Sequence, residues 1–528
     1  MCWGLFKIYL LIIHQRKMKW WALVAVLLLI PDDQYVDGSR ILFISAIASK
    51  SHKGFFTAVI DKLAKEGHQI TIVSPYKPTK EKENVHEIVL SNVDITSLAQ
   101  NVFEGDTMSG AKAIMTIAPK MCSDALGRKE VQELLNEKYD IGMLSIFLSD
   151  CFLSLFHRME IPVIQISPTG PIGPIGALAG LPTFPSFVTN AFLQSFHPLT
   201  FTDRMLNALT DTVSTAAVEH VILPNMDTEC RLQGLCPANM PSLNELKKNA
   251  TVMFVNSVRY MESPPRPSMA SIVYVGGIHC HEAKALPEDL EKWVAGAGED
   301  GFIFFSLGSV VKPSTMPEEY RKVLVKVFGS LKQRVLWKWD TDTMEDLPRN
   351  VRLEKWLPQQ DILGDPRLKV FITHGGALST QESIYHSTPV IGLPVLADQM
   401  TNMAEVQNQG WGRMLKWREL TFEVLRDTIH TVITDEKLRA EVKRRSSLMR
   451  DTPQDLGQLV NYWVDYVIKH NGAHHLKSPF LTMPWYEIYN VDVWLTIAGV
   501  LLLLLLLVLK LFLMCLRCLT SRFKEKHD

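Results

Sequence analysis

The 528-residue sequence lacks an excess of charge of either sign. Its 55 lysines and arginines stand against 56 aspartates and glutamates, a formal net charge of −1. Proteins that bind a nucleic-acid backbone neutralise its phosphates with clustered basic residues, so we expect no nucleic-acid partner. With 47% hydrophobic and 21% charged residues the chain is also too apolar to be disordered, and its length allows two or three domains with their own cores.

Cysteine is scarce as well, with eight in the whole chain. Five of them lie in the body of the protein, and an odd number cannot all pair. These five are Cys122, Cys151, Cys230, Cys236 and Cys280. Cys230 and Cys236 could bridge, but their spacing does not decide it. The pair Cys515 and Cys518 lacks the second ligand pair of a zinc site, so we expect no metal there.

The longest apolar runs lie at the two ends of the chain. Trp20 to Ile30 is apolar throughout, follows several basic residues, and is shorter than the roughly 20 residues that a membrane span needs. We therefore interpret residues 1–36 as a signal peptide that is cleaved between Ile30 and Ser39. An uncleaved signal anchor is the alternative, and Met18 is a second candidate for the start of the chain.

The second apolar run predicts a transmembrane helix over residues 493–516. The run from Trp494 to Leu516 has 23 residues, so at about 1.5 Å per residue it is roughly 34 Å long, enough to cross a bilayer. The tail, 517–528, carries more basic than acidic residues, which favours a cytoplasmic tail and a luminal or extracellular body, as in a type I single-pass protein. The ending Lys524-Glu-Lys526-His-Asp528 resembles the dilysine retrieval signal of the endoplasmic reticulum, although ordinary juxtamembrane basic charge would look the same.

One sequon for N-glycosylation, Asn249-Ala-Thr251, would lie in the luminal or extracellular body, where N-glycosylation takes place. It directly precedes the apolar run from Val252 to Val255, which is typical of a strand. Its use therefore stays open.

Strands and helices alternate along the body, beginning with Arg40–Ser45, a helical pattern over Phe55–Glu66, and Gln69–Ser74. Such alternation predicts doubly wound parallel sheets covered by helices. We expect an N-terminal domain over 37–280, a C-terminal domain over 281–450 and a closing segment over 451–492. Further N-terminal strands are expected at 139–145 and 161–166, and C-terminal strands at 302–307, 334–338, 351–355, 370–373 and 390–393.

Two such halves would face each other across a cleft at the carboxyl ends of their strands, where ligands of these folds bind. The stretch from Ser167 to Phe201 is rich in proline and glycine and predicts loops that line a pocket. No G-x-G-x-x-G follows the first strand of either half, which disfavours a dinucleotide-dependent oxidoreductase.

The densest chemical signal is Phe371-Ile-Thr-His-Gly-Gly-Ala-Leu-Ser-Thr-Gln-Glu382. A buried strand ends at Thr373 and a helix follows, so unpaired N–H groups and the helix dipole favour a phosphate at this point. The two glycines let the backbone approach a ligand closely, and His374 adds a donor. Glu382 can accept hydrogen bonds from both hydroxyls of a ribose. After the next strand, Asp398-Gln399 can bind sugar hydroxyls.

These residues and their order resemble the signature of the UDP-glycosyltransferases, over nearly the whole body. The string from Gly375 to Glu382 and the closing Gly472-Ala-His-His-Leu476 look most like the membrane-bound, UDP-glucuronosyltransferase-like animal members, and Leu378-Ser-Thr-Gln381 looks insect-like. Many family members have asparagine at Leu378, which puts one phosphate contact in doubt. The resemblance implies the two-domain GT-B fold, in which two Rossmann-like domains face each other across a cleft.

The resemblance also carries roles to individual residues. Ser309, in the stretch Phe305 to Ser309, corresponds to a diphosphate donor, Trp356 to the ring that stacks on uracil, and Gln359 to the residue that reads its edge. The residues expected to bind the UDP-sugar are Gly308, Ser309, Trp356, Gln359, His374, Gly375, Gly376, Ser379, Glu382, Asp398 and Gln399.

His52 is the candidate general base. It lies in the loop expected after the first strand, in a segment that resembles the family's catalytic Ser-His segment. Imidazole titrates near neutrality and can take the proton of an attacking hydroxyl. Asp150 is the candidate acid that orients it; an ungapped count places Ser145 at the family's acid position, and a helix cap is the structural alternative for Asp150.

The predicted activity is an inverting transfer of glucose or glucuronic acid from UDP-glucose or UDP-glucuronate to a hydroxyl of a small lipophilic acceptor, as in detoxification. No metal ion or other cofactor is expected. The body would be luminal in the endoplasmic reticulum, with a homo- or hetero-oligomer left open. The alternative is a catalytically silent binding or partner subunit that keeps the fold.

Overall fold

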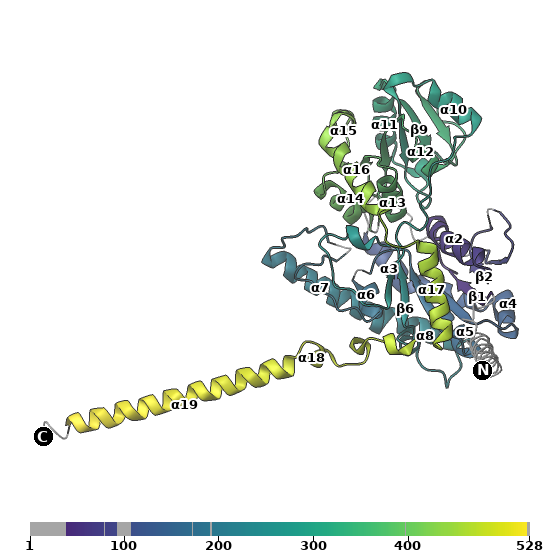
Figure 1. The fold of residues 1–528 in the computed structure, drawn as a ribbon. Helices are drawn as coiled ribbons and strands as arrows, with labels where there is room; N and C mark the ends of the chain where they lie inside the picture. Colours follow the sequence, from purple (N-terminus) through teal and green to yellow (C-terminus); the bar gives the residue numbers. More distant parts are fainter. Residues whose placement is uncertain are drawn as a thin grey trace, which may run out of the picture.

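The computed structural model describes residues 38–524 except 79, 92–106, 172, 191–192 and 397. The predicted leader and the last four residues of the tail lie outside the described residues. Two parallel sheets form two domains, and a long helix, α19, projects from the N-terminal domain (Figure 1).

The first sheet has the strand order β3-β2-β1-β4-β5-β6-β7, with every pair parallel. Its strands are β1 (Arg40–Ile44), β2 (Gln69–Ser74), β3 (Val85–Val89), β4 (Ile141–Ser145), β5 (Val163–Ser167), β6 (Val252–Val255) and β7 (Ile272–Tyr274). In the register of the central strands, Phe43 pairs with Ile72 on one side and with Met143 on the other. The strand order reverses between β1 and β4.

The second sheet has the order β10-β9-β8-β11-β12-β13 and is also parallel throughout. Its strands are β8 (Phe302–Ser306), β9 (Arg334–Lys338), β10 (Val351–Glu354), β11 (Leu368–Thr373), β12 (Val390–Gly392) and β13 (Gly412–Met414). Here the order reverses between β8 and β11. In open α/β sheets ligands bind at the carboxyl ends of the strands beside such a reversal, so each domain has one position for a site.

Helices cover both faces of each sheet (Figure 1). Those of the N-terminal domain are α2 (Lys50–Lys65), α3 (Thr107–Leu126), α4 (Lys129–Gln132), α5 (Leu153–Met159), α6 (Pro174–Leu178), α7 (Phe201–Ala217), α8 (Leu223–Leu232) and α9 (Leu243–Lys247). Those of the C-terminal domain are α10 (Glu288–Ala295), α11 (Glu318–Ser330), α12 (Gln359–Leu363), α13 (Ala377–Tyr385), α14 (Gln399–Asn408), α15 (Phe422–Thr434) and α16 (Glu436–Arg450).

The chain returns to the N-terminal domain after α16. Helix α17 (Leu456–Lys469) buries Val460, Val464 and Val467 in the same apolar cluster as Phe55 of α2 and Phe43 of β1. A polar contact also joins the domains, because the side chain of Gln381 on α13 accepts from the N–H of Gly277 and donates to the carbonyl of Asn256. The segment after residue 450 therefore packs on the N-terminal domain through α17, and Gln381 adds a polar contact between the two domains.

The expected strands are present with shifts of one or two residues at their ends, and β2 and β9 match their predicted limits. The short strands β3, β7 and β13 were not predicted. Helix α2 begins at Lys50 rather than Phe55, because the Ser49 hydroxyl accepts from the N–H of His52 and caps an added first turn. The Ser167–Phe201 stretch contains one short helix, α6, and is otherwise irregular where it is described.

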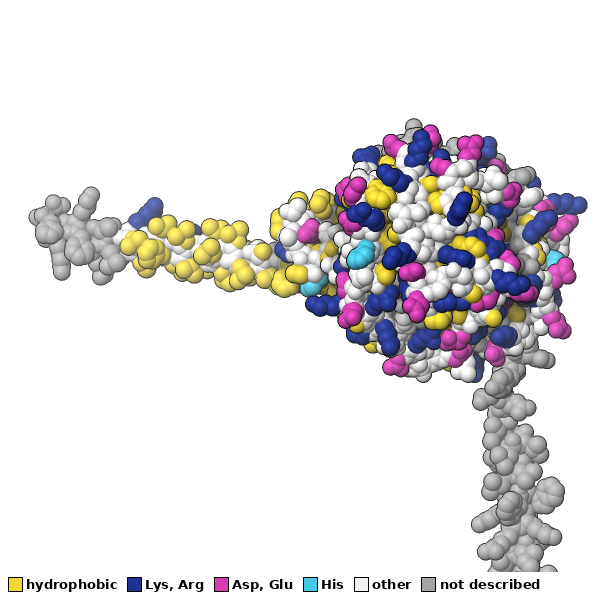
Figure 2. All heavy atoms as spheres, turned by 90° about the horizontal axis from the view of Figure 1, so that it is seen from above, with side chains coloured by type: hydrophobic (Ala, Val, Ile, Leu, Met, Phe, Trp, Pro, Cys, Tyr) yellow, Lys and Arg dark blue, Asp and Glu magenta, His cyan; other side chains and the backbone are white. Residues whose placement is uncertain are grey.

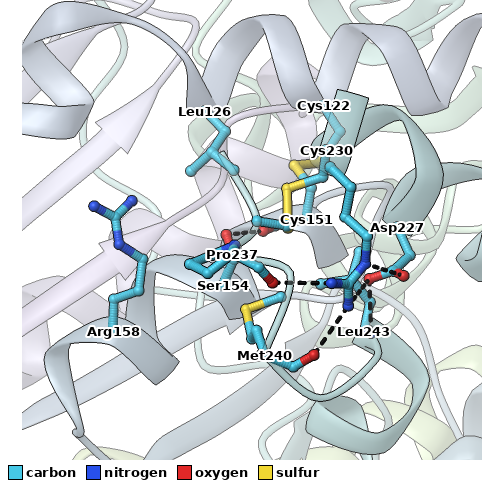
Figure 3. Close-up of a disulfide and its surroundings, with 12 residues drawn as sticks. Cys122, Leu126, Cys151, Ser154, Arg158, Asp227, Cys230, Pro237, Met240 and Leu243 are labelled. Atoms are coloured by element: carbon cyan, nitrogen blue, oxygen red, sulfur yellow. Dashed lines mark hydrogen bonds and ion pairs between the residues drawn. A yellow bond between two sulfur atoms is a disulfide. The ribbon is translucent and has the colours of Figure 1, made fainter. Parts of the chain in front are cut away.

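Four of the five body cysteines are paired. Cys230 bridges Cys236, the pairing that the sequence left open, and Cys122 of α3 bridges Cys151, which the sequence did not identify. All four paired cysteines belong to one buried cluster, part of which Figure 3 shows. Cys280 and Cys515 are free cysteines.

Helix α19 (Val491–Lys524) follows the short helix α18 (Trp485–Ile488) and packs into neither domain. Residues 491–518 form the one helix in the described part of the chain that is long and apolar enough to cross a membrane. Figure 2 shows this helix covered by hydrophobic side chains, whereas acidic and basic side chains are interspersed over the visible face of the body.

Candidate active site

Both strand-order reversals carry predicted site residues at the carboxyl ends of their strands. In the C-terminal domain, Gly308 and Ser309 follow β8, and His374 follows β11. In the N-terminal domain, His52 lies in the first turn of the helix that follows β1, and Phe147 follows β4. The carboxyl ends of the strands in the two sheets therefore carry different side chains. They are called the first edge, in the N-terminal domain, and the second edge, in the C-terminal domain.

The His374 ring lies between two backbone segments that only glycine permits. A Cβ atom added at Gly308 would lie 2.5 Å from His374 Nε2, and one added at Gly376 would lie 2.8 Å from the same atom. Gly308 and Gly375 also adopt φ angles of +80° and +84°, which other residues rarely do. The glycines of the motif thus provide the space for the imidazole as well as the turn into α13.

Two polar atoms at this edge are buried and have no hydrogen-bond partner among the described residues: His374 Nδ1 and Ser309 Oγ. Burial and the nearby Lys338 charge lower the pKa of His374 to about 4, so the ring is neutral at pH 7. Buried polar groups are normally bonded, and unpaired ones beside a helix N-terminus are suited to bind a ligand anion. The diphosphate position expected for both residues stays a prediction.

A second group lies beside it, where Trp356 presents a ring that is 66% exposed. Gln359, the first residue of α12, donates from Nε2 to Ser379 Oγ at 3.0 Å and to Glu382 Oε2 at 2.5 Å. Residues 20 or more apart in the sequence are thus joined into one hydrogen-bonded set beside an exposed aromatic face. An exposed tryptophan, three residues before a half-buried amide that binds a buried carboxylate, provides stacking and edge recognition for a base.

Glu382 is buried on α13, and burial raises its pKa to about 7. Gln360 donates to Glu382 Oε1 at 3.3 Å and to the carbonyl of His279 at 3.0 Å, and its own oxygen accepts from the N–H of His281. His279 Nε2 lies 3.8 Å from Glu382 Oε1. Gln360 therefore connects this carboxylate to the linker between the domains, a role that the sequence did not reveal.

Asp398 and Gln399 lie where β12 leads into α14. Asn402 donates to Asp398 Oδ2 at 2.7 Å and to the carbonyl of Gly375 at 3.0 Å, which joins this turn to the phosphate motif. Burial raises the pKa of Asp398. The side-chain oxygen of Gln399 accepts from the N–H groups of Val395 and Leu396, so it shapes the loop before the helix.

Lys338, at the carboxyl end of β9, was not predicted as a site residue. Its Nζ donates to the carbonyl of Gly308 at 2.9 Å and lies 4.5 Å from the centre of the Trp356 ring. Burial and the charge of Lys50 lower its pKa to about 8. No carboxylate pairs with it among the described residues, so a cation stands between the stacking ring and the phosphate motif. Its place at the carboxyl end of β9 is only a weak sequence signal, because a lysine that ends a strand is usually solvated.

At the second edge, Leu378 of α13 contacts the N-terminal domain. This second residue of α13 is half-buried against the cluster that contains Phe55 and Val460. Its apolar side chain is therefore accounted for by packing between the domains. Leucine has no polar side-chain atom, so Leu378 cannot make the phosphate contact that the resemblance implies for asparagine at this position.

His52 is the chemical group of the N-terminal edge. Its ring packs edge-on against Phe147, with the ring centres 5.0 Å apart, and burial lowers its pKa to about 4. Its Nδ1 atom is buried without a hydrogen-bond partner among the described residues. The imidazole is thus neutral at pH 7, as a group that takes up a proton must be.

Asp150 does not hold this ring in the structure. Its carboxylate accepts from Lys247 Nζ at 2.6 Å, and both side chains are buried. The next residue, Cys151, is fixed by its bridge to Cys122 (Figure 3), which anchors the segment on the far side of the sheet from α2. Asp150 as the orienting acid therefore stays a prediction without a contact to support it, and the ion pair is an alternative reason for the carboxylate.

The spacing Asp-x-Asp, which many metal sites use, occurs at Asp340-Thr-Asp342. Asp340 accepts from Ser314, and Asp342 pairs with Lys355, so the two carboxylates bind different partners. Within the described residues no three histidine, cysteine, aspartate or glutamate side chains come together as a metal site would need. The expectation that no metal is required stays a prediction.

Comparisons with known proteins show which proteins this chain resembles. The family model "UDP-glucoronosyl and UDP-glucosyl transferase" matches residues 43–527. The chain is 30% identical to the UDP-glycosyltransferase UGT5 of Dactylopius coccus over 86% of its length and 88% of that protein. It is 28% identical to the 2-hydroxyacylsphingosine 1-beta-galactosyltransferase of Rattus norvegicus, covering 86% of the chain and 84% of the relative.

Solved glycosyltransferases share the fold. The glycosyltransferase of kitacinnamycin superposes with a TM-score of 0.56 at 17% identity, covering 82% of this chain and 99% of that one. A UDP-glucosyltransferase from Polygonum tinctorium, which glucosylates indoxyl, superposes with a TM-score of 0.56 at 16% identity and the same coverage. The two-domain architecture with facing Rossmann-like sheets is therefore that of the GT-B glycosyltransferases.

Proposed function

The chain belongs to the UDP-glycosyltransferase family, and from this we propose that it transfers glucose or glucuronic acid from the UDP-sugar to a hydroxyl of a small lipophilic acceptor. Sugar transfer from a UDP-sugar follows from the family; the sugar, the acceptor and a role in detoxification are the proposal. The observations that support it are a neutral histidine with an unpaired nitrogen, His52, at the strand-order reversal of one domain, and the unpaired polar atoms of His374 and Ser309 at that of the other.

The donor is proposed to lie along the carboxyl edge of the second sheet. Uracil would stack on the exposed Trp356 ring, with Gln359 at its edge and the Glu382 carboxylate on the ribose hydroxyls. The diphosphate would bind the N-terminus of α13 together with two unpaired donors, His374 and Ser309. Lys338 would add a positive charge beside it, and Asp398 with Gln399 would bind the sugar.

His52 is proposed to act as the general base. It would take the proton from the acceptor hydroxyl while that oxygen attacks C1 of the sugar, and UDP would leave toward the α13 N-terminus. One bond forms at C1 as the bond to the UDP oxygen breaks on the opposite face, which inverts the configuration. The lowered pKa of His52 keeps the base unprotonated before the reaction.

The test is a comparison of His52→Ala with wild type in microsomes, with UDP-glucose and UDP-glucuronate assayed side by side on a panel of phenols and steroids. Loss of a general base is expected to lower kcat about 10²- to 10⁴-fold. UDP affinity should not change, because His52 lies on the other domain. Full activity of His52→Ala would overturn the mechanism. Tight UDP binding by wild type without turnover of either donor would indicate the silent binding subunit instead.

The proposal includes the location. The exposed apolar helix α19 supports a single membrane span, and the basic residues that follow it favour a cytoplasmic tail, with the body in the lumen of the endoplasmic reticulum. A protease added outside sealed microsomes should then remove only the tail. Digestion of the body in intact vesicles would contradict this orientation.

A further inference from the structure

Helix α7 has the reverse of the usual pattern for a surface helix. Its buried residues are polar, Asn207 and Asp211. Asn207 donates to the carbonyls of Pro185 and Val188, and its oxygen accepts from the N–H of Asn190. The polar face of the helix is thus turned inward and holds the irregular segment that precedes it.

The outward face of α7 is apolar. Phe201, Met205, Leu209 and Val213 follow one another at intervals of four residues, and their exposed fractions are 72%, 46%, 55% and 66%. Leu206 is exposed beside them. A surface helix normally turns its polar face to water. A contiguous apolar stripe of this size on the outward face therefore indicates contact with a nonpolar medium.

The segment that leads into α19 is bound to the N-terminal domain near α7. The segment after α17 binds the N-terminal domain, with Lys477 Nζ donating to Asn249 Oδ1 at 3.1 Å and Thr251 donating to the carbonyl of Gly472. At Gly180, just after α6, an added Cβ would lie 2.7 Å from Ser478 Cβ. Helix α6 packs against α7. Both α7 and α19 project to the same side of the N-terminal domain in Figure 1.

Exposed aromatic side chains lie immediately before α19. Trp485, Tyr486 and Tyr489, immediately before α19, are 67%, 43% and 53% exposed. Tryptophan and tyrosine with an exposed ring and a polar end are typical of the bilayer interface. At one edge of the α7 stripe, the Arg204 guanidinium lies 6.0 Å from the Phe201 ring centre, where it can reach lipid headgroups while the ring enters the apolar layer.

We propose that the apolar face of α7 rests in the surface of the same bilayer that α19 spans, so that the N-terminal domain is docked on the membrane at two places. The occupant is lipid rather than a second copy of the chain, because α7 lies on the side of the N-terminal domain from which α19 leaves (Figure 1). This surface stands independently of the transferase activity. If the proposed function also holds, it places the irregular 173–190 segment, packed on the inner face of α7, beside the layer in which lipophilic acceptors dissolve.

The test uses the full chain in lipid nanodiscs. Cys515 and Cys518 are replaced by serine, and an environment-sensitive fluorophore is attached to Leu209→Cys, with Val213→Cys as a second reporter. The matched control is Ser447→Cys, an exposed helix position on α16 in the other domain. Cys280 is present in all three variants and in the unsubstituted background, whose emission is subtracted.

Spin labels on the lipid acyl chains should remove most of the emission at positions 209 and 213, and iodide in the buffer should leave it nearly unchanged. Position 447 should respond in the opposite way. Iodide quenching at 209 and 213 equal to that at 447 would overturn the proposal, since the stripe would then face water. Protection from both quenchers would overturn it too, because protein, such as a second copy, would cover the face.

Discussion

The two strand-order reversals share one topology but differ in chemistry. At the edge of the second sheet, polar side chains form a connected set, in which Gln359 and Gln360 bind Glu382, and Lys338 binds the turn at Gly308. At the edge of the first sheet, one histidine lies against Phe147 with an unpartnered nitrogen. An edge that recognises a nucleotide needs many fixed donors and acceptors, whereas an edge that only removes a proton beside varied apolar molecules needs one polar group.

The prediction with the largest expected effect concerns Asp150. It tests whether the first edge has only one polar group, His52. If Asp150 is structural, Asp150→Ala leaves Lys247 buried without a partner and should cost about 3–5 kcal/mol of stability. The double variant Asp150→Leu, Lys247→Met should recover most of it, measured by denaturant unfolding. Activity per folded molecule should be near wild type in the double variant. A stable double variant that is inactive would instead make Asp150 the acid that orients His52, and the first edge would need two polar groups.

The second prediction tests whether the glycines of the second edge make room for His374. Gly308→Ala should weaken UDP binding roughly ten- to hundredfold, because the added Cβ displaces the imidazole and with it a hydrogen bond to a charged group. Gly410→Ala is the control, because Gly410 has a similar φ of +78° but no atom within 4 Å of an added Cβ. Both variants should lose about 1–2 kcal/mol of stability through backbone strain. Equal UDP affinity in the two variants would contradict this assignment.

The sequence predicted the second edge better than the first for a physical reason. Its residues follow strand ends in a short stretch, so local patterns and family resemblance find His374, Ser379 and Glu382 together. The partner of Asp150 lies 97 residues away, and the cystine partner of Cys151 lies on another helix, so no local pattern indicates either. The first turn of α2 was missed because Ser51 and His52 interrupt its apolar periodicity.

Lys338 shows the same limit within the better-predicted edge. A lysine that ends a strand is usually solvated, and only the packing against Trp356 and the Gly308 carbonyl reveals an unpaired cation. The third prediction follows from it. Lys338→Met should weaken UDP binding about tenfold while leaving uridine binding unchanged, because a charge-assisted bond to phosphate is lost and the stacking ring is kept.

Calorimetric titration of UDP and uridine checks this prediction, with Lys338→Arg as the variant that retains the charge. In wild type, UDP affinity should fall as the pH rises above about 8, where the lowered pKa lets Lys338 lose its proton. Lys338→Arg should not show that fall. An equal loss of UDP and uridine affinity in Lys338→Met would mean that the lysine supports the tryptophan ring rather than binding phosphate.

The smallest expected effect is on the pH dependence of folding stability. The histidines and Glu382 change this stability in opposite directions as the pH falls. Burial lowers the pKa of His52, His279 and His374 to about 4, below the ordinary value of 6.5. The unfolded chain therefore binds more protons between pH 6.5 and about 4, and stability should fall as the pH is lowered through this window. Glu382 acts in the opposite direction, because its pKa of about 7 makes the folded state bind the extra proton between pH 7 and 4.5.

Replacing Glu382 by glutamine should therefore make the loss of stability on acidification steeper, since the opposing contribution is removed while the side-chain shape is kept. Thermal unfolding between pH 7 and 4.5 measures the slope for wild type, Glu382→Gln and His52→Ala. His52→Ala should show a shallower slope than wild type. If both variants follow the wild-type slope, neither group changes its proton affinity on folding, and the contrast between the two edges would rest on geometry alone.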